Sequence, residues 1–104
     1  MDQKELITSI KESFSTVFNE RLKKIVLFGS EARNEAGPES DIDILVLLDE
    51  VKDFGSDLRI CVDSIYLLSL EIDRRISVKP FSISEYEHTD IYYRHKYGDR
   101  FQNL

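Results

Sequence analysis

The stretch that most restricts the fold is DIDILVLL, residues 41–48, in which two aspartates head an apolar run. Its second half has no polar residue, which predicts a strand that is buried on both faces in the centre of a sheet. Two carboxylates at the head of such a strand cost desolvation energy and repel each other unless something cationic offsets them. We therefore expect a ligand at Asp41 and Asp43.

The segments before this strand predict a helix and a second strand. Apolar side chains recur at helical spacing over residues 3–22, and Asp2 with Glu5 resembles the cap of that helix. KIVLFGS, residues 24–30, is a short apolar run that ends at a glycine, as expected for a buried strand entering a turn.

The segments after it predict a long helix and a third strand. Residues 54–72 carry one apolar stripe, RRISVKPFSI alternates as a strand, and Ser82 with Glu85 predicts the cap of a short helix. The stripe consists of Phe54, Leu58, Cys61, Ile65, Leu68 and Ile72. This order of elements predicts one α/β (α+β) domain over residues 1–104, with a small mixed β-sheet covered by helices.

Composition limits the classes of partner. The formal net charge of −6 argues against non-specific binding of nucleic acid and against an anionic membrane surface. No apolar run reaches the length of a membrane span, and the first residues lack the layout of a signal peptide, so we expect a soluble, cytoplasmic protein. The single cysteine, Cys61, lies inside the apolar stripe, which favours a buried hydrophobe over a reactive thiol.

The aspartate pair has the chemistry of a magnesium site. Strand side chains alternate, so Asp41 and Asp43 point to one face, where they can grip one or two hard divalent cations. Upstream, Gly29 and Ser30 follow a strand and offer backbone N–H groups and a hydroxyl to a phosphate. A nucleoside triphosphate between this turn and the metal is the expected ligand.

The spacing of these residues matches a known motif. Gly-Ser, ten residues and then Asp-x-Asp, within GSEARNEAGPESDIDILV, resembles the motif of the minimal nucleotidyltransferases of the DNA polymerase beta-like superfamily, of the MntA-like antitoxin type. The resemblance implies a nucleotidyltransferase fold and binding of Mg-ATP or a related triphosphate. It also implies a partner, a small helical HEPN-type protein that such transferases silence by adding AMP to a tyrosine.

The resemblance assigns roles residue by residue. Gly29 and Ser30 match the phosphate-binding turn, and Asp41 and Asp43 match the metal-binding pair, which makes both aspartates the expected catalytic residues. Arg33, Ser40 and Ile42 match positions that surround them, with Arg33 and Ser40 expected in nucleotide binding.

The chain departs from the family pattern on the third strand. Active members carry a third carboxylate there, where this sequence places Ser77, followed by Lys79 on the same face. Asp73, just before the strand, is an alternative if the register differs. The departure favours one magnesium ion over two and leaves two hypotheses open. The chain is either a nucleotidyltransferase acting on a protein hydroxyl, or a nucleotide-binding or partner-binding module that acts by contact alone.

Several other residues have two interpretations each. Arg33 either contacts a phosphate or forms a surface ion pair with Glu31 or Glu35. His88 and His95 have no partner at metal-ligand spacing, which favours exposed structural roles over catalysis. The aromatic and basic cluster at residues 92–97 fits either a partner surface or ordinary helix packing, and the run DEVKD at residues 49–53 is expected to be a polar loop.

Overall fold

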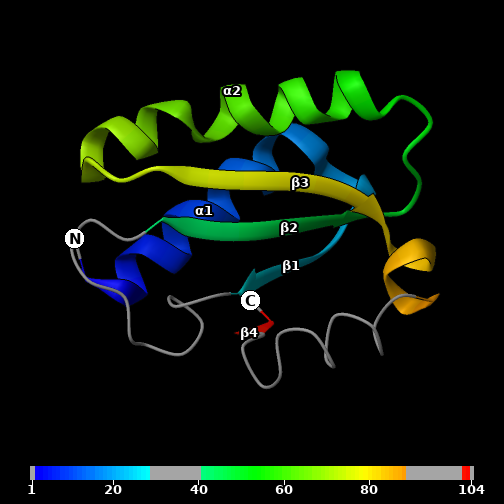
Figure 1. The fold of residues 1–104 in the computed structure, drawn as a ribbon, viewed down its shortest axis with the longest axis horizontal. Coiled ribbons are helices and arrows are strands. Elements are labelled where there is room, and N and C mark those ends of the chain that lie inside the picture. The colour runs from blue at the N-terminus through cyan, green and yellow to red at the C-terminus, as the bar shows by residue number, and fades with distance from the viewer. Residues whose placement is uncertain (1, 29–40, 89–101, 104) are drawn as a thin grey trace.

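The computed structural model describes residues 2–28, 41–88 and 102–103 (Figure 1). The elements in chain order are helix α1 (Gln3–Phe18), the 3-10 turn η1 (Asn19–Arg21), strand β1 (Leu22–Phe28), strand β2 (Ile42–Leu48), helix α2 (Phe54–Ile72), strand β3 (Ile76–Ser82), a helical segment at residues 83–88, and strand β4 (Gln102–Asn103).

The sheet is mixed, and β2 lies inside it. The strand order is β3-β2-β1-β4, as Figure 1 shows. β2 pairs with β3 in parallel and with β1 antiparallel, while β4 pairs antiparallel with β1. The apolar run Ile44–Leu48 is buried throughout, which confirms the predicted central position of this strand.

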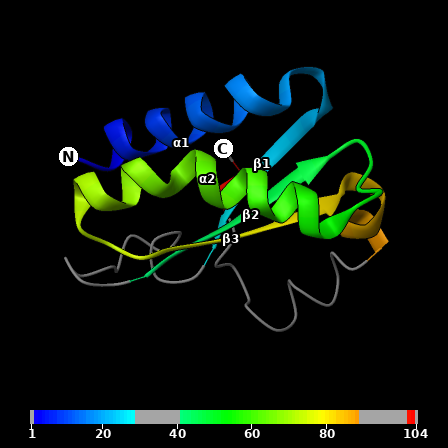
Figure 2. The same cartoon turned by 90° about the horizontal axis from the view of Figure 1, so that it is seen from above.

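Both long helices cover the same face of the sheet, side by side (Figure 2). On this face α1 and α2 pack against alternate β2 residues, namely Ile42, Ile44, Val46 and Leu48. The residues between them face the other way, where Leu45 and Leu47 cluster with Val26 of β1. Phe81, Ile83 and Tyr86 pack against this second cluster. The predicted fold class, a small mixed sheet covered by helices, is confirmed.

Side-chain caps begin the helices at the predicted places. The Asp2 carboxylate accepts a hydrogen bond from the Glu5 N–H at 2.8 Å, and the Ser82 hydroxyl accepts one from the Glu85 N–H at 3.1 Å. The first helix is shorter than predicted. Asn19 takes a positive φ of 50°, which ends α1, so Leu22 begins β1 instead of closing the helix.

The predicted stripe of α2 is correct except at its beginning. Cys61, Ile65 and Leu68 are buried, whereas Phe54, the first residue of the helix, is 49% exposed. Asp57 is buried there instead. Burial raises the pKa of the Cys61 thiol to about 12, so the thiol stays neutral and acts as a hydrophobic side chain.

Two further predictions concern the end of the chain and the membrane. The helical turns predicted before Gly98 lie outside the described residues. β4 has only two described residues, too short a segment to show a strand pattern in the sequence. Among the described helices, none is both long and apolar enough to cross a membrane.

Candidate functional site

The aspartate pair lies where β2 begins. Ile42 and Ile44 are fully buried on the helix side of the sheet, so Asp43 between them faces the opposite side. The Ile42 N–H donates to the Arg75 carbonyl at 2.9 Å, which holds the start of β2 beside the segment entering β3. Asp41 precedes the strand and is exposed. The candidate site is thus on the sheet face that α1 and α2 leave free.

The electrostatics of Asp43 show two carboxylates close to each other. Partial burial raises its pKa, and the negative charge of Asp41 raises it further. Lys79 opposes both effects and lowers it. Within the described part of the chain, neither aspartate forms an ion pair or a hydrogen bond that would offset its charge. Among the described residues, only Lys79 acts on Asp43 with a positive charge.

Strand β3 places two residues beside this pair. In the parallel register Asp43 lies opposite Ser77, and Leu45 lies opposite Lys79. Register partners in a sheet share a face, so Ser77 is the lateral neighbour of Asp43, with Lys79 one step along the same row. Both side chains are exposed.

No third ligand joins the aspartates among the described residues. They contain no group of three or more His, Cys, Asp or Glu side chains arranged to hold a metal. Asp73, the sequence alternative, lies at the end of α2, where it forms the C-cap with a φ of 53°. A third carboxylate is therefore lacking from the part of the site that the structure describes.

Strand β1 approaches the site from its other side. Phe28, the last residue of β1, is the antiparallel partner of Asp43. Gly29 follows it directly in the sequence. The remaining predicted nucleotide-binding residues, Gly29, Ser30, Arg33 and Ser40, lie outside the described residues, so their roles stay predictions.

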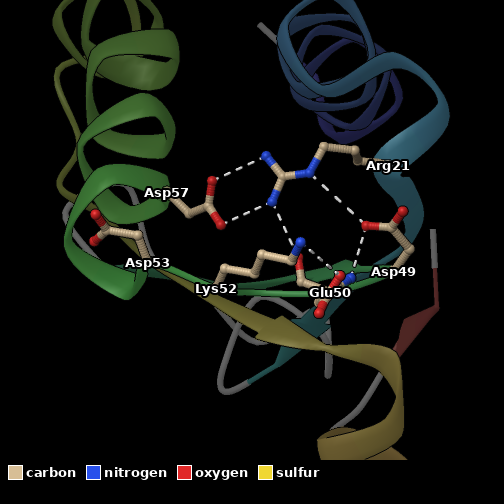
Figure 3. Close-up of a pocket in the computed structure, with 6 residues that line it drawn as sticks. All are labelled: Arg21, Asp49, Glu50, Lys52, Asp53 and Asp57. Carbon is tan, nitrogen blue, oxygen red and sulfur yellow. Dashed lines mark hydrogen bonds and ion pairs between the residues drawn. The ribbon is translucent and has the colours of Figure 1, made fainter.

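A second polar cluster lies at the opposite end of β2 and was not predicted from the sequence (Figure 3). The Arg21 guanidinium donates to both oxygens of Asp57, at 3.0 and 2.8 Å, and to the Glu50 carbonyl at 3.0 Å. Its Nε lies 3.8 Å from the Asp49 carboxylate. The hydrogen bond to Asp57 is the main reason that the pKa of Arg21 is raised. Because its donors are already engaged, we interpret this arginine as structural.

The polar loop at residues 49–53 thus has a structural role. Its backbone and Asp49 help to hold Arg21, and its last residue, Asp53, caps α2 by accepting from the Ser56 N–H at 3.1 Å. The hydrogen bonds to Ser56 lower the pKa of Asp53. The sequence offered no clue to the pair, since Arg21 and Asp57 are 36 residues apart and each occurs in an ordinary charge pattern.

Comparison with known proteins identifies the class. The sequence model of a family described as nucleotidyltransferase domain matches residues 4–97, which is most of the chain. The chain belongs to this nucleotidyltransferase domain family. The resemblance seen in the motif from Gly29 to Asp43 is therefore confirmed at the level of the family.

Two curated relatives come from Methanocaldococcus jannaschii. The chain is 40% identical over 47 residues to "Putative protein adenylyltransferase MJ0141", a match that covers 45% of this chain and 48% of the relative. It is 40% identical over 58 residues to "Putative protein adenylyltransferase MJ0604", covering 56% of this chain and 58% of the relative. The matches thus span about half the length of these relatives.

Solved structures share the fold. Spectinomycin adenyltransferase AAD(9) from Enterococcus faecialis, with ATP and spectinomycin, aligns with a TM-score of 0.65 at 21% identity, covering 98% of this chain and 48% of that one. A mutant of the toxin–antitoxin MntA-HpeT aligns at 0.55 and 18% identity, covering 100% and 72% of the two chains. A toxin–antitoxin with AMP-PNP aligns at 0.56 and 17%, covering 99% and 72%. At these identities the likeness shows the nucleotidyltransferase fold.

Proposed function

We propose that this chain transfers AMP from ATP, with Mg²⁺, to a hydroxyl group of a partner protein. The observation that carries the proposal is the pair Asp41 and Asp43, two neighbouring carboxylates without a compensating ion pair in the described chain. Membership of the nucleotidyltransferase family supports it, as do two relatives named as protein adenylyltransferases.

The donor set fits magnesium. Carboxylate oxygens are the ligands that Mg²⁺ prefers, and it readily completes its shell with phosphate oxygens and water. Burial and, after it, repulsion from Asp41 raise the pKa of Asp43, and a bound cation would offset both costs of the charged carboxylate. Asp41 and Asp43 are the residues that would hold the ion. When bound, it would supply charge neutralisation for the triphosphate and the leaving pyrophosphate.

The transfer itself requires one bond exchange. The acceptor oxygen forms a bond to the α-phosphorus of ATP, and the bond from that phosphorus to the oxygen bridging the α- and β-phosphates breaks. Pyrophosphate leaves with that oxygen, and the proton of the acceptor hydroxyl passes to solvent water. This chain's part is to align the reactants: Asp43 lies beside the last residue of β1, directly before the Gly29-Ser30 turn that we assign to the phosphates. Ser77 next to Asp43 cannot take up a proton as a carboxylate does.

The acceptor is best explained as a protein. The names of the two curated relatives specify protein as the substrate, and two of the similar folds were solved within toxin–antitoxin complexes. We therefore propose that the acceptor is a small helical HEPN-type protein and that the chain acts as its antitoxin. This assignment rests on the family resemblance and on those names.

The composition of the site favours a second candidate function. Ser77 and Lys79 occupy the strand beside Asp43, and no third carboxylate joins the pair among the described residues. A site with two carboxylates holds one metal ion better than two. We therefore expect Mg-ATP to bind although transfer is slow or absent. The alternative is a nucleotide-binding or partner-binding module that neutralises its partner by contact alone.

A titration tests the nucleotide site. We expect Mg-ATP to bind the wild-type chain in isothermal calorimetry and to bind at least tenfold more weakly to Asp41→Asn and Asp43→Asn, which lose a metal ligand. Asp63→Asn, an exposed aspartate on α2, is the matched control and should bind like wild type. Equal binding by all four proteins would refute the assignment.

A transfer assay separates the two candidate functions. Wild-type protein is mixed with an extract of the source cells and α-labelled ATP, and label on protein is measured. Label that depends on both Asp41 and Asp43 supports the transferase. Mg-ATP binding without label supports neutralisation by contact.

A further inference from the structure

We infer that the groove between α1 and α2 is a docking surface for a basic amphipathic helix of a partner protein. The groove is about 500 Å³ and is lined by residues of both helices. The two helices lie side by side on one face of the sheet (Figure 2). The candidate nucleotide site faces the other side of the sheet, so this inference stands independently of the proposed function.

Helix α2 is apolar on two sides, which is unusual for a helix at the surface. One side packs on the sheet through Cys61, Ile65 and Leu68. Large apolar side chains on the rest of the helix remain exposed, including Val62, Tyr66, Leu67 and Leu70. Leu67 is 75% exposed, the highest value among them. Surface helices normally carry polar residues at such positions, so this second apolar side is a candidate interface. Of these four residues, Leu67 lines the groove, and the other three extend the apolar surface beyond its edge.

The groove beside Leu67 is suited to apolar side chains. Leu68 forms a nearly buried part of its lining, and Val17 and Leu67 add exposed apolar surface. Three of the hydroxyl groups in its lining are already bonded within their own helices. Ser13 donates to the Ser9 carbonyl at 2.8 Å, Thr16 to the Glu12 carbonyl at 2.8 Å, and Ser64 to the Ile60 carbonyl at 2.6 Å.

These hydroxyl groups therefore do not need a hydrogen-bond acceptor from an occupant of the groove. A bound side chain would meet mainly the carbon atoms of small residues, which allow another helix to approach closely. Docking of an amphipathic helix through a few apolar anchors is an established mode of recognition.

The charges around the groove determine the kind of helix. Glu12 and Glu71 line it, and no lysine or arginine does so among the described residues. By helical spacing Lys4 and Lys11 fall on the other side of α1. A partner helix with apolar anchors flanked by lysine or arginine complements this surface.

The same charges disfavour other occupants. A second copy of this chain would bring acidic groove walls together, and each copy has a net charge of −6. An anionic lipid surface would be repelled by the same glutamates. The partner is therefore a different protein with a basic helix.

Photocrosslinking tests the inference. The full chain is produced in its source cells with p-benzoylphenylalanine at Leu67 and, as a matched control, at Thr8, which is exposed on α1 away from the groove lining. We expect a crosslink from position 67 and not from position 8, with the crosslinked segment of the second protein sequenced by mass spectrometry. A basic amphipathic helix at that point supports the inference. A crosslink to a second copy, to an acidic segment or to lipid, or no crosslink at all, overturns it.

Charge reversal provides the second readout. The double variant Glu12→Lys and Glu71→Lys, with the crosslinker at position 67, should reduce the crosslinked yield at least tenfold, because it replaces attraction by repulsion. Lys4→Glu with Lys11→Glu, the reverse change on the far side of α1, should leave the yield within twofold. A circular-dichroism spectrum and a thermal melt like those of wild type show that the acidic-to-basic variant is folded. An unchanged yield in that variant refutes the charge argument, whatever the outcome for nucleotide transfer.

Discussion

The two ends of β2 each carry carboxylates, but only one end compensates them within the described chain. After the strand, Asp49 and the buried Asp57 share Arg21, and Asp57 accepts both arms of the guanidinium. At the start of the strand, Asp41 and Asp43 repel each other, and among the described residues only Lys79 acts against that repulsion, without forming an ion pair.

We interpret the difference as a structural use of charge at the Arg21 end and, under the proposed function, a ligand-binding use at the Asp43 end. A buried carboxylate that serves the fold needs a partner on the same chain, since an unpaired buried charge is costly. A carboxylate pair that serves a ligand must keep its coordination sites open, and the protein tolerates the repulsion until a cation binds. Folding stability should therefore depend on the Arg21 end, and ligand binding on the Asp43 end.

The largest effect expected is on transfer. Ser77→Asp places a carboxylate in register beside Asp43 and should raise labelling of protein by α-labelled ATP by about 10² to 10⁴, the usual scale of an acid–base group. If Lys79 competes for the new charge, the double variant with Lys79→Ala will show the full gain. Fast labelling by the wild-type chain, not increased by either variant, would mean that another residue already fills this role.

The next effect is on stability at the other end of the strand. Asp57→Ala removes the bidentate partner of Arg21 and should lower the free energy of unfolding by about 2 to 3 kcal/mol. The loss stays below that of a fully buried pair because the Arg21 side chain is 40% exposed. Urea denaturation measures it. Asp63→Ala, whose exposed partner Arg59 lies 4.0 Å away, is the control and should change stability by less than about 0.5 kcal/mol. Equal losses in the two variants would remove the contrast between the ends.

The contrast was only half visible in the sequence. The face that Asp43 takes could be predicted because its signal is local: alternation along DIDILVLL puts it opposite the buried Ile42 and Ile44. The roles of Asp41, Asp43 and Gly29 in the motif stay predictions. The Arg21 end could not be predicted, because the pairing with Asp57 depends on how α2 lies against the start of β1. That arrangement is decided by tertiary packing, which no local pattern records.

The fold, too, was predicted correctly where the sequence signal is local and missed where tertiary packing decides. The limits of α2 were predicted correctly from the apolar stripe of residues 54–72, and the central place of β2 from its continuous apolar run. The end of α1 was predicted four residues late, because Leu22 continues the apolar spacing of the helix although Asn19 ends it. The exposed second side of α2 was missed since a stripe search finds the face that packs on the sheet and passes over apolar residues elsewhere.

A smaller effect tests whether the Asp43 end is destabilised without a cation. Burial and Asp41 raise the pKa of Asp43 in the folded state, so wild type loses stability as pH rises from the usual aspartate value near 3.8 through the raised one. Asp43→Asn should therefore be more stable above that window, by less than about 1 kcal/mol, and equal to wild type below it. Thermal melts from pH 3 to pH 8 without metal would show it.

Magnesium and ATP should reverse this order. Wild type gains stability from the bound ligand, and Asp43→Asn gains little because it lacks one carboxylate ligand. If the variant is less stable than wild type at pH 7 without metal, Asp43 already has a compensating partner and the two ends do not differ as argued.

The smallest effect concerns Lys79, the weakest of the three influences on Asp43. Lys79→Gln removes the nearby positive charge, so the pKa of Asp43 should rise further above its usual value. Carboxyl carbon shifts followed by NMR across a pH titration measure the change. Lys52→Gln, a lysine at the other end of β2 that lines the Arg21 pocket, is the matched control and should leave Asp43 unaffected. Lys79 lies two residues beyond Ser77 on the same face of β3. The size of the pKa change therefore measures how strongly its ammonium group offsets the charge of Asp43. An unchanged pKa would show that the Lys79 ammonium group stays away from the carboxylates, so that no cationic side chain of the described residues offsets their charge.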